Sequence, residues 1–299
     1  MQPKVSIIIP IYNKQAYLRQ CLGSLKAQTL AEIEFFCIND GSTDDSEKIL
    51  QEFASKDERF KVINQLHIGT GAARNKGLEL AQGEYVGFVD ADDWVAADYF
   101  EKLYMQTKAE DADICCALQR KDIYRDREVT TTTPWHEDKT LMKKQLILTA
   151  GHLWSKIFRR AFVEKYHLRN ATTRRTQDIA FSVPAILQAE RISAVKDTFY
   201  YYRISENSAS HQAIERQDCF ELGEIFKLIL AQEYADNDAI KLIRARLQAD
   251  TQYYLSRTIQ FKNKIIIFKS LIKNVTDFNW KANEQAAYRT ARLMTFLGM

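Results

Sequence analysis

The sequence predicts an α/β fold with a central, mostly parallel sheet and a helical C-terminal region. Through the first third of the chain, short apolar runs alternate with amphipathic stretches of helical periodicity. The apolar runs are almost continuously apolar, which is typical of parallel strands covered by helices on both faces. From about residue 212 the periodicity is helical throughout. We therefore expect a layered α/β domain followed by helices.

The expected elements come in strand–helix pairs. In order, they are VSIIIP with YLRQCLGSLKAQ, EFFCIN with SEKILQEFA, FKVIN with AARNKGLELA, and EYVGFV with ADYFEKLYMQTKA. After about Asp111, irregular strands, a polar loop, two or three helices and a last aromatic strand, TFYYYRI, follow. This pattern divides the chain into residues 1–110 and 111–211, the two halves of one α/β domain, and a helical region over residues 212–299.

Composition excludes several classes of protein. The chain has 299 residues, 46% of them hydrophobic and 27% charged, which excludes a disordered or disulfide-built protein. The net charge is +3 with both signs interspersed, so nucleic acid is not an expected partner. Five scattered cysteines without metal-ligand spacing indicate a reducing compartment. With no apolar run of about 18 residues, we expect a cytoplasmic protein.

Three carboxylates stand together in FVDADDW, directly after an apolar strand. Acidic groups crowded beside a buried strand end are costly unless a cation or hydrogen-bond donors compensate them. Hard oxygen ligands favour Mg²⁺ or Mn²⁺, which bind through one or two carboxylates together with substrate phosphates. The simpler interpretation is that Asp92 and Asp93 cap a helix around Val95–Thr107. We assign that role to Asp93 and expect Asp90 and Asp92 to bind a ligand.

Two further segments place polar side chains after strands. Asp40 lies between a strand and the helix start GSTDDS, where it either accepts a base N–H or has a structural role, and both remain open. In HIGTGAARNKG, Gly69 and Gly71 match a dinucleotide fingerprint only in part. A helix N-terminus with Arg74 in its first turns favours a phosphate, although a solvated basic face would explain it equally.

Three segments of the chain together resemble a family 2 glycosyltransferase of the GT-A fold, which is Rossmann-like. They are VSIIIPIYNKQAYLRQCLGSLKAQT, CINDGSTDDS and GAARNKGLELAQGEYVGFVDADDW. The resemblance covers residues 4–110 and extends more loosely to about residue 211. It implies a nucleotide-sugar-binding half over residues 1–110 and an acceptor-side half over residues 111–211. It also implies donor-site residues: a uracil wall at Pro10, Ile11 and Tyr12, Asp40 for the uracil N3–H, and a D-x-D motif of Asp90, Ala91 and Asp92 for ribose and metal. Asp92 would bind the Mn or Mg ion.

The same resemblance implies a catalytic base at Asp178. Relatives usually carry Glu-Asp followed by Phe, and this chain has Gln177 before Asp178 and Ile179 after it. Asp178 could instead cap the helix that runs to Gln188. Trp154 and Lys156 match a W-x-K stretch common in these enzymes and could border the donor diphosphate or the acceptor, although core packing suits Trp154 better.

Two histidines, His211 and His67, can be compared with the corresponding positions of family members. His211 lies where some relatives close the metal site, and an ordinary surface histidine is the simpler interpretation. His67 replaces a common Asn, and the sequence assigns it no role.

These residues predict a metal-dependent inverting glycosyltransferase of the hexosyltransferase class. It would move a hexose or N-acetylhexosamine from a UDP-sugar to a hydroxyl of a glycan or lipid-linked glycan acceptor, in cell-surface polysaccharide or lipopolysaccharide synthesis. A sugar nucleotidyltransferase and a non-catalytic nucleotide-sugar-binding protein are the alternatives.

The basic amphipathic segment FKNKIIIFKSLIKNV predicts peripheral contact with the cytoplasmic face of the membrane. A packed helix with solvated lysines explains this segment equally well.

Overall fold

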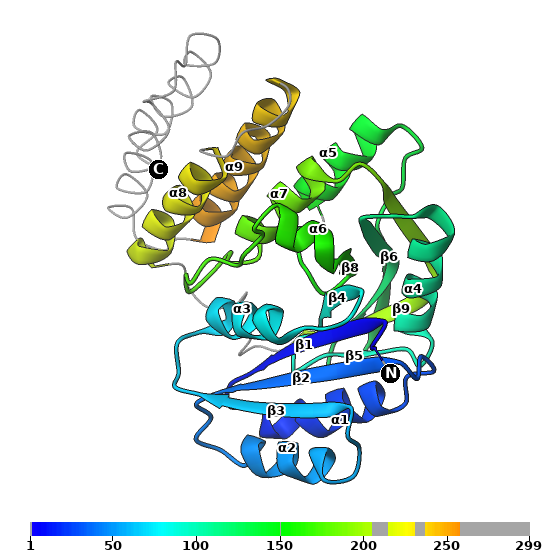
Figure 1. Cartoon of the computed structure of the whole chain (residues 1–299). Coiled ribbons are helices and arrows are strands. Elements are labelled where there is room, and N and C mark those ends of the chain that lie inside the picture. Colours follow the sequence, from blue (N-terminus) through cyan, green and yellow to red (C-terminus); the bar gives the residue numbers. More distant parts are fainter. Residues whose placement is uncertain (1, 150, 205–214, 231–236, 258–299) are drawn as a thin grey trace.

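The computed structural model describes residues 2–149, 151–204, 215–230 and 237–257. Its centre is a nine-stranded mixed sheet in which the order along the main path is β3-β2-β1-β4-β8-β6-β9-β5, with β7 paired to β6 (Figure 1). The strands are β1 (Val5–Ile11), β2 (Ile33–Asp40), β3 (Phe60–Gln65), β4 (Tyr85–Phe88), β5 (Trp94–Val95), β6 (Ile114–Ile123), β7 (Glu128–Thr132), β8 (Lys156–Arg159) and β9 (Ile192–Arg203). The predicted α/β class is confirmed.

The first four strands of the main path, β3, β2, β1 and β4, pair in parallel, as the strand–helix alternation predicts. All residues of β1, β2 and β4 are buried, because helices cover both faces of this part of the sheet. The helices that follow these strands are α1 (Gln15–Lys26), α2 (Ser46–Ala54), α3 (Thr70–Leu80) and α4 (Tyr99–Glu110).

Two apolar cores lie on the two faces of the sheet. Successive residues of a strand point to opposite faces, so Ile8 joins one core while Ile7 and Ile9 join the other. Helices α1, α2 and α4 cover one core, and α3 covers the other together with the helices of the C-terminal half. Figure 1 shows α1 and α2 on the opposite side of the sheet from α3.

The second half of the sheet is antiparallel at β4–β8, β6–β8, β6–β7 and β5–β9, and parallel at β6–β9. The short strand β5 was not expected from the sequence. Its residues Trp94 and Val95 pair with Tyr201 and Tyr200 of β9, so this segment is extended rather than helical. The predicted helix around Val95–Thr107 therefore begins only at Tyr99.

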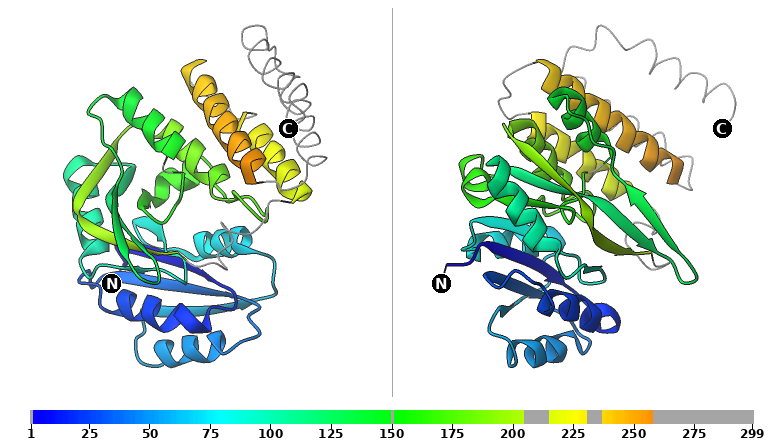
Figure 2. Two further views of the ribbon diagram at one scale, coloured as in Figure 1. Left: turned by 180° about the vertical axis from the view of Figure 1, so that it is seen from behind. Right: turned by 90° about the vertical axis from the view of Figure 1, so that its right-hand side faces the viewer.

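The remaining described helices gather on the α3 side of the sheet. They are α5 (Lys139–Thr149), α6 (Arg160–Lys165), α7 (Ile179–Gln188), α8 (Arg216–Leu230) and α9 (Asn237–Arg257). Figure 2 shows α8 and α9 lying against the α5–α7 side of the domain. Their buried residues, among them Leu222, Phe226 and Ile243, belong to the same core as α3 and α7. The predicted helical region is thus confirmed where the structure describes it, and it is packed onto the α/β domain.

Some predictions fall on other parts of the chain. The predicted boundary at residues 211–212, His211 and the basic segment 261–275 lie outside the described residues. Among the described helices, none is both long and apolar enough to cross a membrane.

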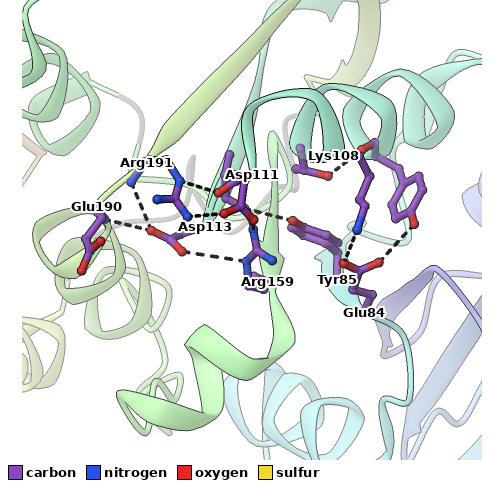
Figure 3. Close-up of polar contacts among 11 residues, drawn as sticks. Glu84, Tyr85, Lys108, Asp111, Asp113, Arg159, Glu190 and Arg191 are labelled. Atoms are coloured by element: carbon purple, nitrogen blue, oxygen red, sulfur yellow. Dashed lines mark hydrogen bonds and ion pairs between the residues drawn. The ribbon is translucent and has the colours of Figure 1, made fainter.

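Ion pairs and hydrogen bonds tie the elements together at the amino end of β4 (Figure 3). Asp111, just after α4, is bound by Arg159 and by Arg191, each at 2.6 Å. Asp113 accepts hydrogen bonds from the backbone N–H groups of Glu190 (2.9 Å) and Arg191 (3.1 Å). These contacts fix the start of β9 against the start of β6, where Ile114 pairs with Ile192, and the register then shifts between Ala117 and Gln119.

Replacing Asp113 by Ala should destabilise the fold by about 1–2 kcal/mol, because two backbone N–H groups lose their charged acceptor. Urea denaturation followed by circular dichroism measures this free energy of unfolding. The matched control is Asp197→Ala, since Asp197 forms an ion pair with Lys102 but its side chain is 72% exposed. Such a surface pair should change stability by less than about 0.5 kcal/mol. Equal effects of the two substitutions would contradict the role given to Asp113.

Candidate active site

The predicted site residues converge at the carboxyl edge of the parallel strands, where ligands of open α/β sheets bind. Tyr12 follows β1, Asp40 ends β2, and Asp90 follows β4. Because β1 pairs with both β2 and β4, these three positions lie on neighbouring strands. The topology therefore brings together side chains up to 78 positions apart, as the 2.5 Å contact between Lys14 and Asp92 shows directly.

Asp40 is almost completely buried and accepts several hydrogen bonds from the loop after β3. Its Oδ1 accepts from Gln65 Nε2 at 2.7 Å and from the backbone N–H of Ile68 at 3.0 Å, and its Oδ2 accepts from the backbone N–H of Gly69 at 2.8 Å. Burial alone would raise the pKa of Asp40, but these hydrogen bonds and nearby His67 outweigh it and lower the pKa. Asp40 is therefore a charged acceptor.

Tyr12 and His67 form a stacked pair above Asp40. Their ring centroids are 3.9 Å apart and their planes differ by 18°. His67 Nδ1 lies 2.8 Å from Asp40 Oδ2, so the imidazole donates to the carboxylate. Pro10 and Ile11 are buried within β1, whereas Tyr12 is 41% exposed. Of the three predicted wall residues, Tyr12 thus presents the ring surface.

Asp90 is held by Arg74. The guanidinium of Arg74, on α3, donates through Nη2 to Asp90 Oδ1 at 2.8 Å. Arg74 is buried, and its Nε has no hydrogen-bond partner among the described residues. Because Gly71 lies in the first turn of α3, the helix can approach the backbone carbonyl of Ala171. The alternative interpretation of Arg74 as part of a solvated basic face is therefore excluded, because the side chain is buried and contacts Asp90.

Asp92 faces Lys14, the residue just before α1. Lys14 Nζ lies 2.5 Å from Asp92 Oδ2. Burial by itself would lower the pKa of Lys14, but the charge of Asp92 and the hydrogen bond to it outweigh burial and raise that pKa. The ammonium group is therefore charged and neutralises Asp92.

Asp93 has a different role from the predicted helix cap. It is buried, and its carboxylate accepts from the Tyr200 hydroxyl at 2.9 Å and from the backbone N–H of Arg203 at 2.8 Å. Asp98, not Asp93, precedes α4. Burial and the neighbouring charges of Asp92 and Asp90 raise the pKa of Asp93 well above its usual value. Asp93 thus anchors the acidic loop to β9.

Asp178 is half-buried and stands at the N-cap position of α7, but its side chain makes no capping hydrogen bond. The simpler interpretation of this residue as a helix cap is therefore not supported. Burial raises the pKa of Asp178, and the charge of Asp90 raises it further, while Arg74 and Arg246 act in the opposite direction. Asp178 therefore lies close enough to Asp90 for the charge of Asp90 to raise its pKa.

Trp154 and Lys156 lie deeper than the site. Trp154 belongs to the apolar core and stacks between His152, at 3.8 Å, and Tyr200, at 4.3 Å, which agrees with the expected packing role. Lys156 is buried, and its Nζ donates to the carbonyl oxygen of His152 at 2.8 Å. Burial lowers the pKa of this lysine. The contact of these two residues with a donor or acceptor stays a prediction.

The sequence did not predict four residues that contact the site aspartates or affect their pKa. They are Lys14, His67 as a partner of Asp40, Tyr200 and Arg246. Tyr200 and Arg246 lie more than 100 positions from the acidic loop, on β9 and α9, and no local pattern links them to it. The position of Lys14 is a weak indication of a role in the site, because it is a cation that closely follows the first predicted strand. His67 stands where relatives often carry Asn, and that difference alone does not predict its contact with Asp40.

Comparison with known proteins decides the family. The model of the family described as "Glycosyl transferase family 2" matches residues 6–167, which is more than half of the chain. The chain belongs to this glycosyltransferase family. It is also 34% identical to EpsH of Bacillus subtilis (strain 168), which carries a provisional glycosyltransferase assignment, over 88% of this chain and 77% of EpsH. The predicted family and the general glycosyltransferase activity are confirmed.

Two other proteins are similar to this transferase. The crystal structure of S. aureus TarS 1–349 in complex with UDP-GlcNAc superimposes with a TM-score of 0.82 and 22% identity, covering 99% of this chain and 92% of that one. This similarity confirms the GT-A fold. The poly(ribitol-phosphate) beta-glucosyltransferase of Bacillus spizizenii is 27% identical over 87% of this chain and 42% of its own length.

Replacing Tyr200 by Phe should lower stability by about 1–3 kcal/mol, because the buried Asp93 loses a donor and the backbone N–H of Asp90 loses its acceptor, the Tyr200 hydroxyl at 3.2 Å. Denaturant unfolding at pH 7 measures the difference. Tyr201→Phe is the matched control, since Tyr201 stacks on Trp94 and its hydroxyl has no hydrogen bond within the described part of the chain. A Tyr200→Phe variant as stable as Tyr201→Phe would contradict this anchoring role.

Proposed function

We propose that this transferase moves a hexose or N-acetylhexosamine from a UDP-sugar to a hydroxyl of a glycan acceptor, with inversion at the anomeric carbon. The observation that carries the proposal is the placement of Asp178, an aspartate with a raised pKa, within the field of the donor-side residues Asp90 and Arg74. A base with a pKa nearer to neutrality is suited to accept a proton from a hydroxyl group. UDP-GlcNAc in the structure of similar TarS supports a UDP-sugar as donor.

In the proposed donor complex, the uracil stacks on Tyr12 and donates its N3–H to Asp40, and Asp90 binds the ribose. Arg74, which already pairs with Asp90, has a second polar nitrogen, Nε, without a partner in the described residues, and directs positive charge toward the diphosphate. Asp178 removes the proton from the acceptor hydroxyl as its oxygen attacks the anomeric carbon. The bond from that carbon to the diphosphate oxygen breaks, and UDP leaves.

The family resemblance implies a Mn or Mg ion, and the residues present fit one. Asp92 is partly exposed, and within the described chain only one of its carboxylate oxygens, Oδ2, has a recorded side-chain partner. One carboxylate with two phosphate oxygens and water is a usual environment for Mg²⁺. When bound, the ion would supply positive charge that stabilises the leaving diphosphate. Lys14 must leave Asp92 Oδ2 if the ion takes that oxygen.

We place the acceptor among cell-surface polysaccharides. The name of the similar poly(ribitol-phosphate) beta-glucosyltransferase describes a phosphate-containing polymer as acceptor.

A panel of UDP- and GDP-sugars tests the donor. Incubation with glycan acceptors should release UDP from at least one UDP-hexose or UDP-N-acetylhexosamine, and no GDP should be released. Coupled nucleotide detection measures the rate. The Asp178→Asn variant is the control, since it should bind UDP normally while its transfer rate falls at least about a hundredfold. Near-normal transfer by Asp178→Asn would contradict the base assignment, and release of GDP alone would contradict the uridine donor.

The pH dependence of the wild-type reaction follows from the raised pKa of Asp178. Only the ionised carboxylate can accept a proton, so kcat/KM should rise with pH through that pKa. The apparent pKa of the acidic limb of the pH–rate profile should therefore lie above the ordinary aspartate pKa of about 3.9. An acidic limb at or below that value would show that another group acts as base.

Mn²⁺ binding tests whether Asp92 binds the metal ion and whether Lys14 competes with the ion for Asp92. In the presence of UDP, Asp92→Asn should weaken Mn²⁺ binding at least about tenfold, because it removes the charged ligand. Lys14→Met should strengthen Mn²⁺ binding severalfold, because the competing ammonium is gone. Electron paramagnetic resonance of free Mn²⁺ measures both dissociation constants. If Asp92→Asn binds Mn²⁺ as the wild type does, the metal site lies elsewhere.

A further inference from the structure

His67 makes the same two contacts that the proposed donor needs from a nucleobase. Its planar ring stacks on Tyr12 at 3.9 Å, and its Nδ1 lies 2.8 Å from Asp40 Oδ2. A uracil bound as proposed would stack on Tyr12 and donate N3–H to Asp40. The imidazole is thus an aromatic ring with one N–H in the position expected for the base.

While His67 stays in place, a nucleobase can neither stack on this face of Tyr12 nor donate a hydrogen bond to Asp40. Ring centroids 3.9 Å apart are in van der Waals contact, so no second ring can enter between Tyr12 and His67. Asp40 has about four acceptor positions on its two oxygens. Gln65, Ile68, Gly69 and His67 together use four of them.

Of these four donors, His67 and Gln65 are side chains that can turn away without unfolding the loop, and His67 is the one that also stacks on Tyr12. Two of the others are backbone N–H groups, fixed by the turn that ends at Gly69, whose φ is +110°. The side chain of His67 is 52% exposed, and rotation about its side-chain bonds would carry the ring into solvent. The loop backbone can stay where it is, packed against Gly41, where a Cβ would come within 2.9 Å of His67 N.

The neighbours of His67 show that the inward position of its ring is specific. Leu66 and Ile68, on either side, are 85% and 61% exposed, so the loop does not turn its apolar side chains toward the site. His67 alone among these three residues points to Tyr12 and Asp40. Contact with Asp40, rather than burial of the loop, holds the ring there.

We propose that His67 occupies the nucleobase position of the donor site and is displaced when the nucleotide binds. This inference rests on the proposed function, because it takes Tyr12 and Asp40 as the base contacts. Displacing the ring lowers the apparent affinity for the nucleotide, since only the fraction of molecules with the ring turned out can bind. The competition does not affect sugar phosphates that lack a base, because they do not need the position that the ring occupies.

Calorimetric titration with UDP tests this competition. His67→Ala should bind UDP about three- to tenfold more tightly than the wild type, because one hydrogen bond to a carboxylate and one ring stack no longer compete. Ribose 5-phosphate, which has no base, should bind both proteins equally. Leu66→Ala is the matched control: it changes the neighbouring side chain of the same loop, and its dissociation constant for UDP should stay within about twofold of the wild type.

Nuclear magnetic resonance gives a readout that does not depend on the substitution. The ring protons of His67, assigned by comparison with His67→Ala, should lie upfield because of the Tyr12 ring and should move downfield when UDP is added. A His67 signal that keeps its upfield position in saturating UDP would overturn the proposal.

The outcomes separate this inference from the function on which it rests. If neither wild type nor His67→Ala binds UDP, the proposed uridine donor fails and the inference fails with it. If both proteins bind UDP and His67→Ala binds it equally or more weakly, His67 either has no part in binding or contacts the bound base, and only the inference is overturned. A thermal unfolding curve confirms that each variant is folded.

Discussion

The concentration of carboxylates at the carboxyl edge of the sheet is the constraint on which this structure depends. Four aspartates stand at or just after the ends of buried strands, and burial of uncompensated charge is costly. They are Asp40, Asp90, Asp92 and Asp93. Each has its own compensation within the protein: loop N–H groups for Asp40, Arg74 for Asp90, Lys14 for Asp92, and Tyr200 with Arg203 for Asp93. The partners come from helices and strands far apart in the chain, so the acidic edge also holds the elements together.

The compensating groups differ in how easily a ligand can replace them. Arg74 and Tyr200 are buried and fixed by the surrounding elements, whereas Lys14 and His67 are side chains at the rim with exposed surface. In the proposed donor complex, the nucleotide and its ion would meet buried, fixed charges first and exposed side chains that can move aside second. Asp93 and Tyr200 have structural roles because they bind each other inside the protein.

The sequence predicted the parallel half of the sheet well because strand–helix alternation is a local pattern. Tyr12, Asp40 and Asp90 lie at one edge because each stands at or just after the carboxyl end of a parallel strand, which follows from the predicted strand–helix order. The sequence-based prediction was wrong where tertiary contacts determine the local structure or the role of a residue. Trp94 and Val95 became a strand only because β9 is available to pair with them, and Asp93 turned from a helix cap into the partner of Tyr200 for the same reason. Arg246 reaches the neighbourhood of Asp178 from α9, which no spacing rule could predict.

The anchoring of the acidic loop by β9 has a consequence for the order in which the protein is made. A chain that leaves the ribosome from its N-terminus completes the acidic loop at residue 93 long before Tyr200 and Arg203 of β9 are available. Until then the carboxylate of Asp93 lacks these two partners, so the acidic loop cannot make its contacts with β9 before that strand has been synthesised. Contacts between such distant positions also slow folding. The edge therefore matures late in synthesis, once β9 has emerged and docked.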